Sequence, residues 1–329
     1  MSDLMPGEAR KGMPVVRAAV PFAAGTFGAG LGGADAPSWY VGVDGGATRC
    51  RARVRDAAGA ALADADGDPA NIHVDFASAV SAMRAVVGEV LRKAGLGAND
   101  GHRIAVGLGL AGLNDAADAA HVADAFKGYR LVRAANDATT ACIGAHAGAD
   151  GGLVIAGTGS AAIARVAGVE TIVGGRGFAL GDGGSGAHIG LDALRAATLA
   201  ADGLAPQTEL TEEVLRAFDG DVIRMVRWAR SATPGEYGAF APRVFRYVAK
   251  ADPVALAIVA SAGRSIGALT RRIVALGADH VALAGGVGEA LRPHLDSDIA
   301  RLLKRPLYDA MDGAILMAGG AVATREAMQ

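Results

Sequence analysis

Three aspartates stand where an apolar segment of the chain gives way to a turn, which is a position from which a carboxylate can reach a ligand. Asp44 ends the apolar run 41–43 and precedes two glycines. A carboxylate at such a rigid edge can hold a phosphate-bound Mg²⁺ or its waters. An aspartate before glycine also satisfies turn N–H groups in ordinary hairpins, so the motif alone leaves both interpretations open.

The other two aspartates each precede an expected helix. Asp137 follows the apolar segment 131–135, and Asp182 lies in GDGGSG at 181–186. Asp137 is therefore either a general base for an alcohol nucleophile or a helix N-cap. Asp182 can accept hydrogen bonds from two sugar hydroxyls or cap the following helix. Position in the sequence does not separate these alternatives.

One pattern occurs twice, as VGVDGGATRCRARV at 41–54 and LVIAGTGSAAIARV at 153–166. Aligned without a gap, both copies indicate a strand, a glycine-rich turn and a second strand, with a hydroxyl at Thr48 or Ser160. Glycine turns let backbone N–H groups converge on an anion. The repeat therefore predicts two phosphate clamps facing each other across a cleft. Ala156 replaces Asp44 in the second copy, and this asymmetry favours a metal-side role for Asp44.

Apolar periodicity predicts strands that alternate with helices, which indicates an α/β fold with covered sheets. The 253–276 helix has a continuous apolar stripe that we interpret as core. Beyond the two hairpins, we expect strands at 104–110, 131–135 and 280–284, and helices from Val74 to near Gly95 and at 187–200, 211–218, 222–229, 242–250, 253–276 and 313–325.

Composition excludes several classes of protein. The chain has 329 residues, 51% of them hydrophobic and 20% charged, and a formal net charge of -2. At about 150 residues per domain this length predicts two domains, and the small net charge gives no sign of a nucleic-acid-binding surface.

The two cysteines form no disulfide or metal framework, so we expect a cytoplasmic protein. The chain has no uninterrupted apolar run of about 18 or more residues, so we do not expect a membrane span. Residues 1–38, rich in Ala, Gly and Pro, are interpreted as a poorly ordered extension.

Several residues with the spacing of a functional motif are better explained by ordinary structural roles. Arg49, Arg51, Arg53 and Arg55 alternate along one strand, and we interpret them as a solvated strand face. Cys142 and His146, four residues apart on an expected helix, have no third partner in sequence range and are interpreted as packing residues. GxGxxG occurs in three places, none of them with the strand–turn–helix context and acidic residue of a dinucleotide-binding fold.

The motifs taken in order resemble those of a known family. They are VGVDGGATRC, the AND at 135–137, LVIAGTGSAA, GDGGSG, VALAGGVGEAL and DAMDGAILMAGG. This series resembles the phosphate, connecting and adenosine motifs of the actin and hexokinase superfamily. Within it, the chain is similar to the N-acetylglucosamine kinase and benzoyl-CoA-reductase-activator ATPase family, above all to bacterial glucosamine kinases, over residues 39–323.

The resemblance implies two ribonuclease-H-like, actin-like ATPase domains that close on ATP, Mg²⁺ and an amino sugar. The first would comprise residues 39–146 with the returning segment 310–329, and the second residues 147–309 with a helical insertion. The implied reaction is ATP-dependent 6-phosphorylation of glucosamine, with N-acetylglucosamine as the alternative substrate. A homodimer is compatible with this interpretation.

The resemblance also assigns roles to residues. Asp44 would hold Mg²⁺ through water, and Asp137 would take the proton from the sugar's 6-hydroxyl. Ala47 stands where the family often has a third glycine, and its Cβ puts phosphate binding in doubt. The phosphate-side positions are Gly45, Gly46, Thr48, Thr158 and Gly159; the nucleoside positions are Gly285 and Gly286; the sugar positions, besides Asp137, are Asn71, Ser160, Gly175, Arg176, Gly177 and Asp182.

Two other functions fit parts of the pattern. An ATPase that activates a reductase needs cysteines to hold an iron–sulfur cluster, and Cys50 and Cys142 lie in the wrong motifs for that role. A sugar sensor would bind without phosphorylating, and the presence of both Asp44 and Asp137 argues against it.

Overall fold

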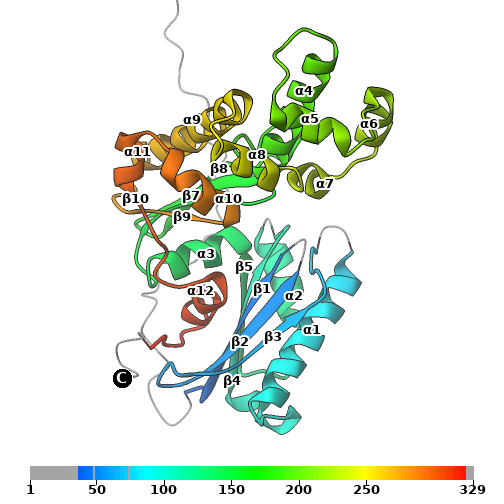
Figure 1. Ribbon diagram of the computed structural model, residues 1–329. Helices are drawn as coiled ribbons and strands as arrows, with labels where there is room; N and C mark the ends of the chain where they lie inside the picture. The colour runs from blue at the N-terminus through cyan, green and yellow to red at the C-terminus, as the bar shows by residue number, and fades with distance from the viewer. Residues whose placement is uncertain (1–35, 47–48, 73–74, 114, 324–329) are drawn as a thin grey trace, which may run out of the picture.

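The computed structural model describes residues 36–46, 49–72, 75–113 and 115–323, which form two β-sheets with helices around and between them (Figure 1). Most of the expected extension 1–38 lies outside the described residues. The sheets have strand orders β3-β2-β1-β4-β5 and β10-β9-β6-β7-β8. In both, the central strand pairs with a hairpin partner on one side and a parallel strand on the other. The repeated strand–turn–strand units predicted from the sequence are confirmed, each at the centre of its own sheet.

The strand bounds show where each sheet meets its turns. In the first sheet, β4 is buried along its whole length. β1 to β3 are antiparallel neighbours, and β4 and β5 run parallel to β1. The first sheet comprises β1 (Trp39–Gly45), β2 (Cys50–Asp56), β3 (Ala61–Gly67), β4 (Ile104–Leu110) and β5 (Leu131–Asn136), and the second β6 (Gly151–Ala156), β7 (Ser160–Val166), β8 (Val169–Gly174), β9 (Val281–Ala284) and β10 (Leu303–Lys304).

Helices cover both faces of the first sheet. On one face, α1 (Phe76–Lys93) and α2 (Ala116–Ala125) bury an apolar cluster with the strands. On the other face lie α3 (Asp137–Ala145) and α12 (Ala310–Met317), which pack together. α3 also packs against β6 and β7, so this helix lies between the two sheets, as Figure 1 shows. A short 3₁₀ helix, η1 (Ala98–Arg103), precedes β4.

The second half contains the predicted helical insertion between β8 and β9. Side-chain caps begin most of its helices, among them Asp221, Thr233 and Asp252, since each oxygen accepts from backbone N–H groups of the first turn. The insertion comprises α4 (Gly186–Ala201), α5 (Glu209–Arg216), α6 (Val222–Ala229), α7 (Pro234–Gly238), α8 (Ala241–Val248) and α9 (Pro253–Ala275). Three further helices follow β9: α10 (Gly286–Leu291), η2 (Arg292–His294) and α11 (Ser297–Leu302).

The long helix α9 is, by length and composition, apolar enough to cross a membrane. Ile258, Ile266 and Ile273 on one of its faces are buried in the core of the second sheet. The predicted core stripe is therefore confirmed, and the burial of this face is typical of the core helix of a globular domain.

The last predicted helix, 313–325, was wrong in both bounds. α12 begins at Ala310, because the Asp309 side chain caps it by accepting from the N–H of Asp312. It ends at Met317, because Gly319 takes a φ of 90° and its N–H bonds back to Leu316 O. A glycine in the left-handed conformation is a common helix terminator.

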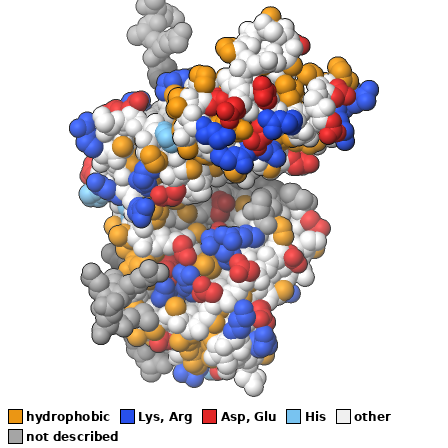
Figure 2. All heavy atoms as spheres, in the orientation of Figure 1, with side chains coloured by type: hydrophobic (Ala, Val, Ile, Leu, Met, Phe, Trp, Pro, Cys, Tyr) orange, Lys and Arg blue, Asp and Glu red, His pale blue; other side chains and the backbone are white. Residues whose placement is uncertain are grey.

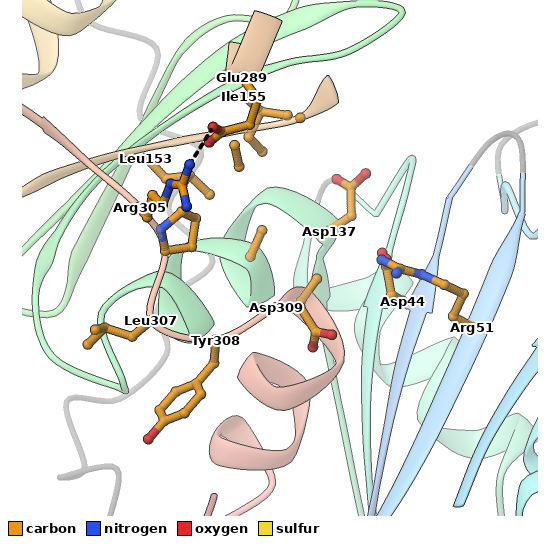
Figure 3. A pocket seen from close by; sticks show the side chains of 15 residues that line it. Asp44, Arg51, Asp137, Leu153, Ile155, Glu289, Arg305, Leu307, Tyr308 and Asp309 are labelled. Atoms are coloured by element: carbon orange, nitrogen blue, oxygen red, sulfur yellow. Dashed lines mark hydrogen bonds and ion pairs between the residues drawn. The ribbon is translucent and has the colours of Figure 1, made fainter. Parts of the chain in front are cut away.

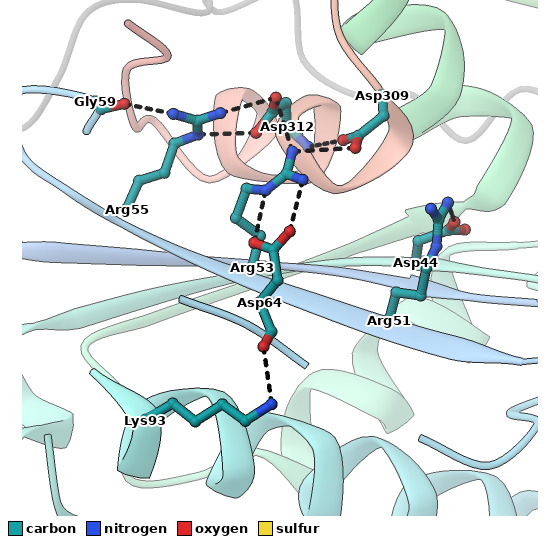
Figure 4. A network of polar contacts seen from close by, with 9 residues as sticks. All are labelled: Asp44, Arg51, Arg53, Arg55, Gly59, Asp64, Lys93, Asp309 and Asp312. Carbon is teal, nitrogen blue, oxygen red and sulfur yellow. Dashed lines mark hydrogen bonds and ion pairs between the residues drawn. The ribbon is translucent and has the colours of Figure 1, made fainter. Parts of the chain in front are cut away.

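The solvated arginine face predicted on β2 was also wrong, because α12 and its preceding turn return across it (Figure 4). Arg55 is 8% exposed and makes a two-pronged contact with Asp312, with Nε–Oδ1 and Nη2–Oδ2 distances of 2.8 and 3.0 Å. Arg53 bonds Asp64 on β3 and Asp309 ahead of α12. Arg53 and Arg55 therefore fasten the last helix to the first sheet, whereas Arg49, just ahead of β2, is exposed as predicted.

The gapless alignment of the two hairpins does not hold through both strands. It implies that Ala156 pairs with Ile163, as Asp44 pairs with Arg51, but Ala156 pairs with Ser160. The reason is the second turn, which is tighter: the N–H of Gly157 donates to the carbonyl of Gly159 at 2.9 Å and closes the turn directly. Ser160 consequently lies in β7 and not within a turn.

Candidate functional site

A cavity of about 800 Å³ lies where the ends of the two sheets approach α3 and the start of α12 (Figure 3). Residues from both halves of the chain form its wall, so the cavity depends on how the sheets are placed. The lining residues are Asp44, Arg51, Asp137, Ala141, Leu153, Ile155, Ala284, Gly285, Glu289, Arg305, Pro306, Leu307, Tyr308, Asp309 and Ala310.

Asp44 lies near the end of β1 and faces the cavity, as its place in the sequence predicted. Its carboxylate forms an ion pair with Arg51, the residue directly opposite on β2, with a distance of 2.6 Å between Oδ2 and Nη2. The Asp44 side chain is 20% exposed, so the pair is only partly screened by water. Asp44 is thus a cavity carboxylate with a side-chain partner, and not simply an acceptor for turn N–H groups.

Asp137 is the first residue of α3, and its carboxylate lines the same cavity. The helix N-cap is the preceding residue, Asn136, whose Oδ1 accepts from the N–H of Ala138 at 2.9 Å. Capping therefore does not account for Asp137, although its Oδ1 also accepts from that N–H. Burial raises the pKa of Asp137 above its ordinary value, and the negative charge of Asp44 raises this pKa further.

Hydrogen bonds fix the first turn of α3 from several sides. Asn136 Nδ2 donates to Leu113 O at 3.1 Å, which ties the first turn of α3 to the turn after β4. Thr139 Oγ1 donates to Glu170 Oε2 on β8 at 2.7 Å, which ties it to the second sheet. Contacts with both sheets therefore hold the segment that carries Asp137, which fixes the place of this residue beside the cavity.

The turn after β1 is held by its neighbours. The carbonyl of Gly45 accepts from the N–H of Ala111 at 2.8 Å, and the carbonyl of Gly46 accepts from the N–H of Ala70 at 3.1 Å. Asn71, a predicted sugar contact, adjoins Ala70 and is thus brought to this turn. Thr48, predicted to contact phosphate, and Ala47, the departure from the family pattern, lie outside the described residues.

The predicted sugar-side residues of the second half come together around the β6–β7 turn. Ser160 Oγ donates to Gly183 O at 2.9 Å, and its backbone carbonyl accepts from the N–H of Gly175 at 3.1 Å. Arg176 adjoins Gly181, and Gly177 follows it in the exposed loop. These residues form one group, but none of them lines the cavity that holds Asp44 and Asp137.

Asp182 belongs to this second group and does not cap α4. Ser185 is the N-cap, with its Oγ accepting from the N–H of His188. Asp182 has a φ of 61°, and a Cβ on Gly159 would come within 2.8 Å of its Oδ2. Gly159 therefore leaves room for the Asp182 carboxylate beside the turn. Thr158 is exposed, and its carbonyl accepts from the N–H of Ala187.

Gly285 connects the two groups of predicted residues. It lines the cavity, has a φ of 93°, and a Cβ there would come within 2.2 Å of the carbonyl oxygen of Ala156, just before the β6–β7 turn. Only glycine fits such a close approach with positive φ. Gly286, the first residue of α10, is exposed, and a Cβ added to it would meet no described atom within 4 Å.

The carboxylates suit a magnesium ion bound together with phosphates. Among the described residues, no group of three or more His, Cys, Asp or Glu side chains could enclose a metal ion. Mg²⁺ usually keeps several waters and binds through one or two carboxylates plus substrate phosphates. Asp44, with Asp137 in the same cavity, fits that pattern.

Four charged residues of the cavity were not predicted as site residues: Arg51, Glu289, Arg305 and Asp309. Arg305 lies 3.9 Å from Glu289, across the cavity from Asp44 in Figure 3. The sequence did hold one signal, because a run of alternating arginines and a later DAMD segment carry complementary charges. Only the returning path of α12 shows that they meet.

The cysteine and histidine predictions are confirmed as packing. His146 Nε2 lies 2.8 Å from Gly152 O, and Cys142 Sγ contacts Gly151 O. Cys50 and Cys142 are both buried and unbridged, and burial raises the pKa of each thiol to about 12. A thiol with such a pKa is a poor nucleophile or metal ligand near neutral pH.

Comparisons with known proteins agree with this geometry. Residues 41–318 match the BadF/BadG/BcrA/BcrD ATPase family. The glucosamine kinase GspK of Vibrio cholerae serotype O1 is 33% identical over 282 residues, which are 86% of this chain and 96% of that protein. The crystal structure of a candidate N-acetylglucosamine kinase from Chromobacterium violaceum is also 33% identical, with a TM-score of 0.79 over 86% of this chain and 99% of that one.

A more distant structure shows the fold alone. It is a ROK family glucokinase from Streptomyces griseus, solved in complex with glucose and AMPPNP. Its TM-score is 0.50 at 18% identity, covering 85% of this chain and 98% of that one. The predicted α/β fold with an actin-like ATPase arrangement is confirmed by these structures.

Proposed function

Because the chain belongs to the BadF/BadG/BcrA/BcrD ATPase family, we propose that it is an ATP-dependent kinase that phosphorylates the 6-hydroxyl of glucosamine. The names of its relatives support this choice, since one is a glucosamine kinase and another a candidate N-acetylglucosamine kinase, each 33% identical. The small molecule that it binds would accordingly be an amino sugar.

The observation that carries the proposal is that the carboxylates of Asp137 and Asp44 line the same cavity between the sheets. Asp137 would accept the proton of the attacking hydroxyl, and its raised pKa suits this task because it brings the carboxylate closer to the basicity that proton transfer needs. Asp44 would face the phosphates. Bound there, Mg²⁺ would neutralise negative charge on the transferring phosphoryl group.

The remaining predicted residues would bind and orient. The glycines at 45, 46, 159, 285 and 286 would let the backbone approach phosphate and nucleoside, and the group around Ser160 and Asp182 would hold the sugar. That group lies outside the cavity of Asp137, so a productive complex requires the two halves to move toward each other. Such closure also excludes water, which otherwise competes with the sugar hydroxyl for the phosphoryl group.

The two candidate sugars differ only at the 2-amino group. A charged amine favours an anionic surrounding, whereas an acetamide favours an apolar pocket with an amide partner. Asp182 and Arg176 both belong to the sugar-side group, so that group carries charges of both signs. The relative that bears the glucosamine name decides our preference.

An ATP-consumption assay with glucosamine, N-acetylglucosamine, glucose or no sugar tests the proposal. We expect the largest kcat/KM with glucosamine and a 6-phosphate product by NMR. ATP hydrolysis that does not depend on sugar would instead indicate a reductase-activating ATPase, although the burial of both thiols argues against a cluster ligand role. Sugar binding without ATP consumption would indicate a sensor. Cytoplasmic location and a homodimer remain parts of the proposal.

A further inference from the structure

Thr139 and Glu170 form a polar contact between the two halves of the molecule. Thr139 lies in the first turn of α3 and is 3% exposed, and its Oγ1 donates to Glu170 Oε2 on β8 at 2.7 Å. A distance this short is typical of a strong hydrogen bond from a hydroxyl to an ionised carboxylate. Beside it, Ala138 and Cys142 of α3 pack against Ile163 in an apolar cluster. Apolar contact has no preferred direction, so the hydrogen bond fixes the rotation of the turn against this sheet.

The geometry of the helix connects this contact to Asp137. Successive residues of an α-helix are about 100° apart around the axis, so Thr139 and Asp137 point in nearly opposite directions. The Thr139 hydroxyl faces β8, while the Asp137 carboxylate lines the cavity, as Figure 3 shows. A contact that holds one side of the turn therefore also sets the direction of the carboxylate on the other side.

The strand β8 joins the same contact to the sugar-side group. Glu170 lies near the start of this strand, which leads directly into the loop 175–177. Gly175 at the start of that loop donates its N–H to the carbonyl of Ser160 at 3.1 Å. Figure 2 shows the surface hollowed between the two halves. Across this junction, β8 links the turn that carries Asp137 to the loop that is expected to hold the sugar.

Glu170 is a costly residue for a purely structural contact. Burial raises the pKa of its carboxyl above the ordinary value, although the Thr139 hydrogen bond and the charge of Arg165 lower this pKa. Since the net shift is upward, burial outweighs these partners, and the charged carboxylate does not stabilise the fold. Proteins accept such costs mainly at functional sites, which indicates a role in alignment.

We propose that Glu170 is a positioning residue, which through Thr139 sets the direction of Asp137 and aligns this carboxylate with the sugar-side loop that follows β8. The inference rests on the proposed role of Asp137 as the base. It gives a function to a carboxylate outside the cavity, at a position that no sequence motif singled out. A misplacement of about 1 Å can slow an enzymatic reaction about 10²-fold, so the loss of one such contact is measurable.

Steady-state kinetics of three variants of the full chain test the inference. Thr139→Val keeps the shape of the side chain and removes the hydroxyl, so we expect kcat for sugar phosphorylation to fall about 10- to 100-fold, with ATP affinity unchanged. Thr139→Ser keeps the hydroxyl, and its kcat should be close to wild type. Glu170→Met removes the acceptor. The double variant with Thr139→Val should be no slower than the slower single variant, because the same contact is lost in each.

The matched control is Thr270→Val. Thr270 is also buried on a helix, but its Oγ1 donates to Ile266 O within α9, so we expect wild-type kcat. Wild-type kcat in Thr139→Val, an equal loss in Thr139→Ser, or additive losses in the double variant would overturn the inference. A contact that serves only stability would lower the midpoint of denaturant unfolding and leave kcat unchanged. Should Thr139→Val not fold, Glu170→Met is compared with Glu170→Gln, which keeps an acceptor oxygen, and equal kcat values would overturn the inference.

A measurement that needs no sugar separates this inference from the proposed function. Amide hydrogen exchange of α3 should be faster in Thr139→Val than in Thr270→Val, because the first turn has lost its tie to β8. If wild-type protein phosphorylates no sugar, the kinase proposal fails. Faster exchange would then still support the positioning of Asp137, and equal exchange would refute it. An active sugar kinase whose kcat does not change in Thr139→Val would refute only the inference.

Discussion

On β2 the side chains that face α12 are arginines, whereas on β7 the side chain that faces α3 is Ile163, packed with Ala138 and Cys142. The two hairpins are copies of one pattern, yet one joins its helix by ion pairs and the other by apolar contact. The charged contact fastens the end of the chain to the first sheet. The apolar contact holds α3, which carries the proposed base. The repeat therefore defines the strands, while the face of each copy is adapted to a different helix.

The largest expected effect is on catalysis, at the helix held by apolar contacts. Asp137→Asn removes the proposed base, and we expect kcat to fall about 10²- to 10⁴-fold, the usual contribution of general base catalysis. ATP affinity, measured by calorimetry, should remain close to wild type because the variant keeps its shape. Turnover equal to wild type would refute the role of Asp137.

The next largest effect is on stability, at the helix held by ion pairs. Asp312→Ala leaves buried Arg55 without its carboxylate, and we expect a loss of about 3–5 kcal/mol in the free energy of unfolding, as for other broken buried pairs. Denaturant unfolding followed by circular dichroism measures this. As a control, Glu89→Ala breaks the exposed pair with Arg92 and should leave the midpoint unchanged. Equal midpoints for the two variants would contradict a structural role for the Asp312 network.

The raised pKa of Asp137 predicts a pH dependence. A base is active only when deprotonated, so kcat/KM should rise with pH through an inflection that lies above the ordinary aspartate pKa of about 4. The effect on stability has the opposite sign. Because the pKa of Asp137 is raised in the folded state, its protonated form stabilises the folded protein at pH below the unfolded-state pKa. This stabilisation is lost as the pH rises through the folded-state pKa. Asp137→Asn should therefore unfold at a higher temperature than wild type at pH 7, measured by calorimetry. A lower Tm would mean that the charged form is stabilised.

The smallest expected effect is at the apolar contact itself. Ile163→Val removes one methylene beside α3, and we expect a loss of about 0.5–1.5 kcal/mol in the free energy of unfolding. The same denaturant measurement checks it. A loss as large as that of Asp312→Ala would erase the difference between the two hairpin faces.

Much of the fold and part of the site were predictable from local signals. The positions of Asp44 near the end of β1 and of Asp137 directly after β5 were predictable, because a strand end is marked by its neighbours in sequence. The roles of the two carboxylates stay predictions. The sequence did not show which residue caps α3. Asn and Asp are both good N-caps, and Asn136 and Asp137 are adjacent, so either could have preceded the first helical residue. Arg51 was missed because an alternating arginine row looks the same whether water or carboxylates face it.

The sequence alone determined the repeated hairpins, the α/β order and the strand ends that carry the carboxylates, because turn glycines, caps and apolar periodicity act over a few residues. The tertiary structure alone decided that α12 covers the arginines of β2, that β7 pairs three positions out of the gapless register, and that one cavity joins Asp44 to Arg305. These depend on contacts between segments far apart in the chain, whose energies come from burial and charge pairing. The local pattern shows which residues could pair but does not fix which of them meet.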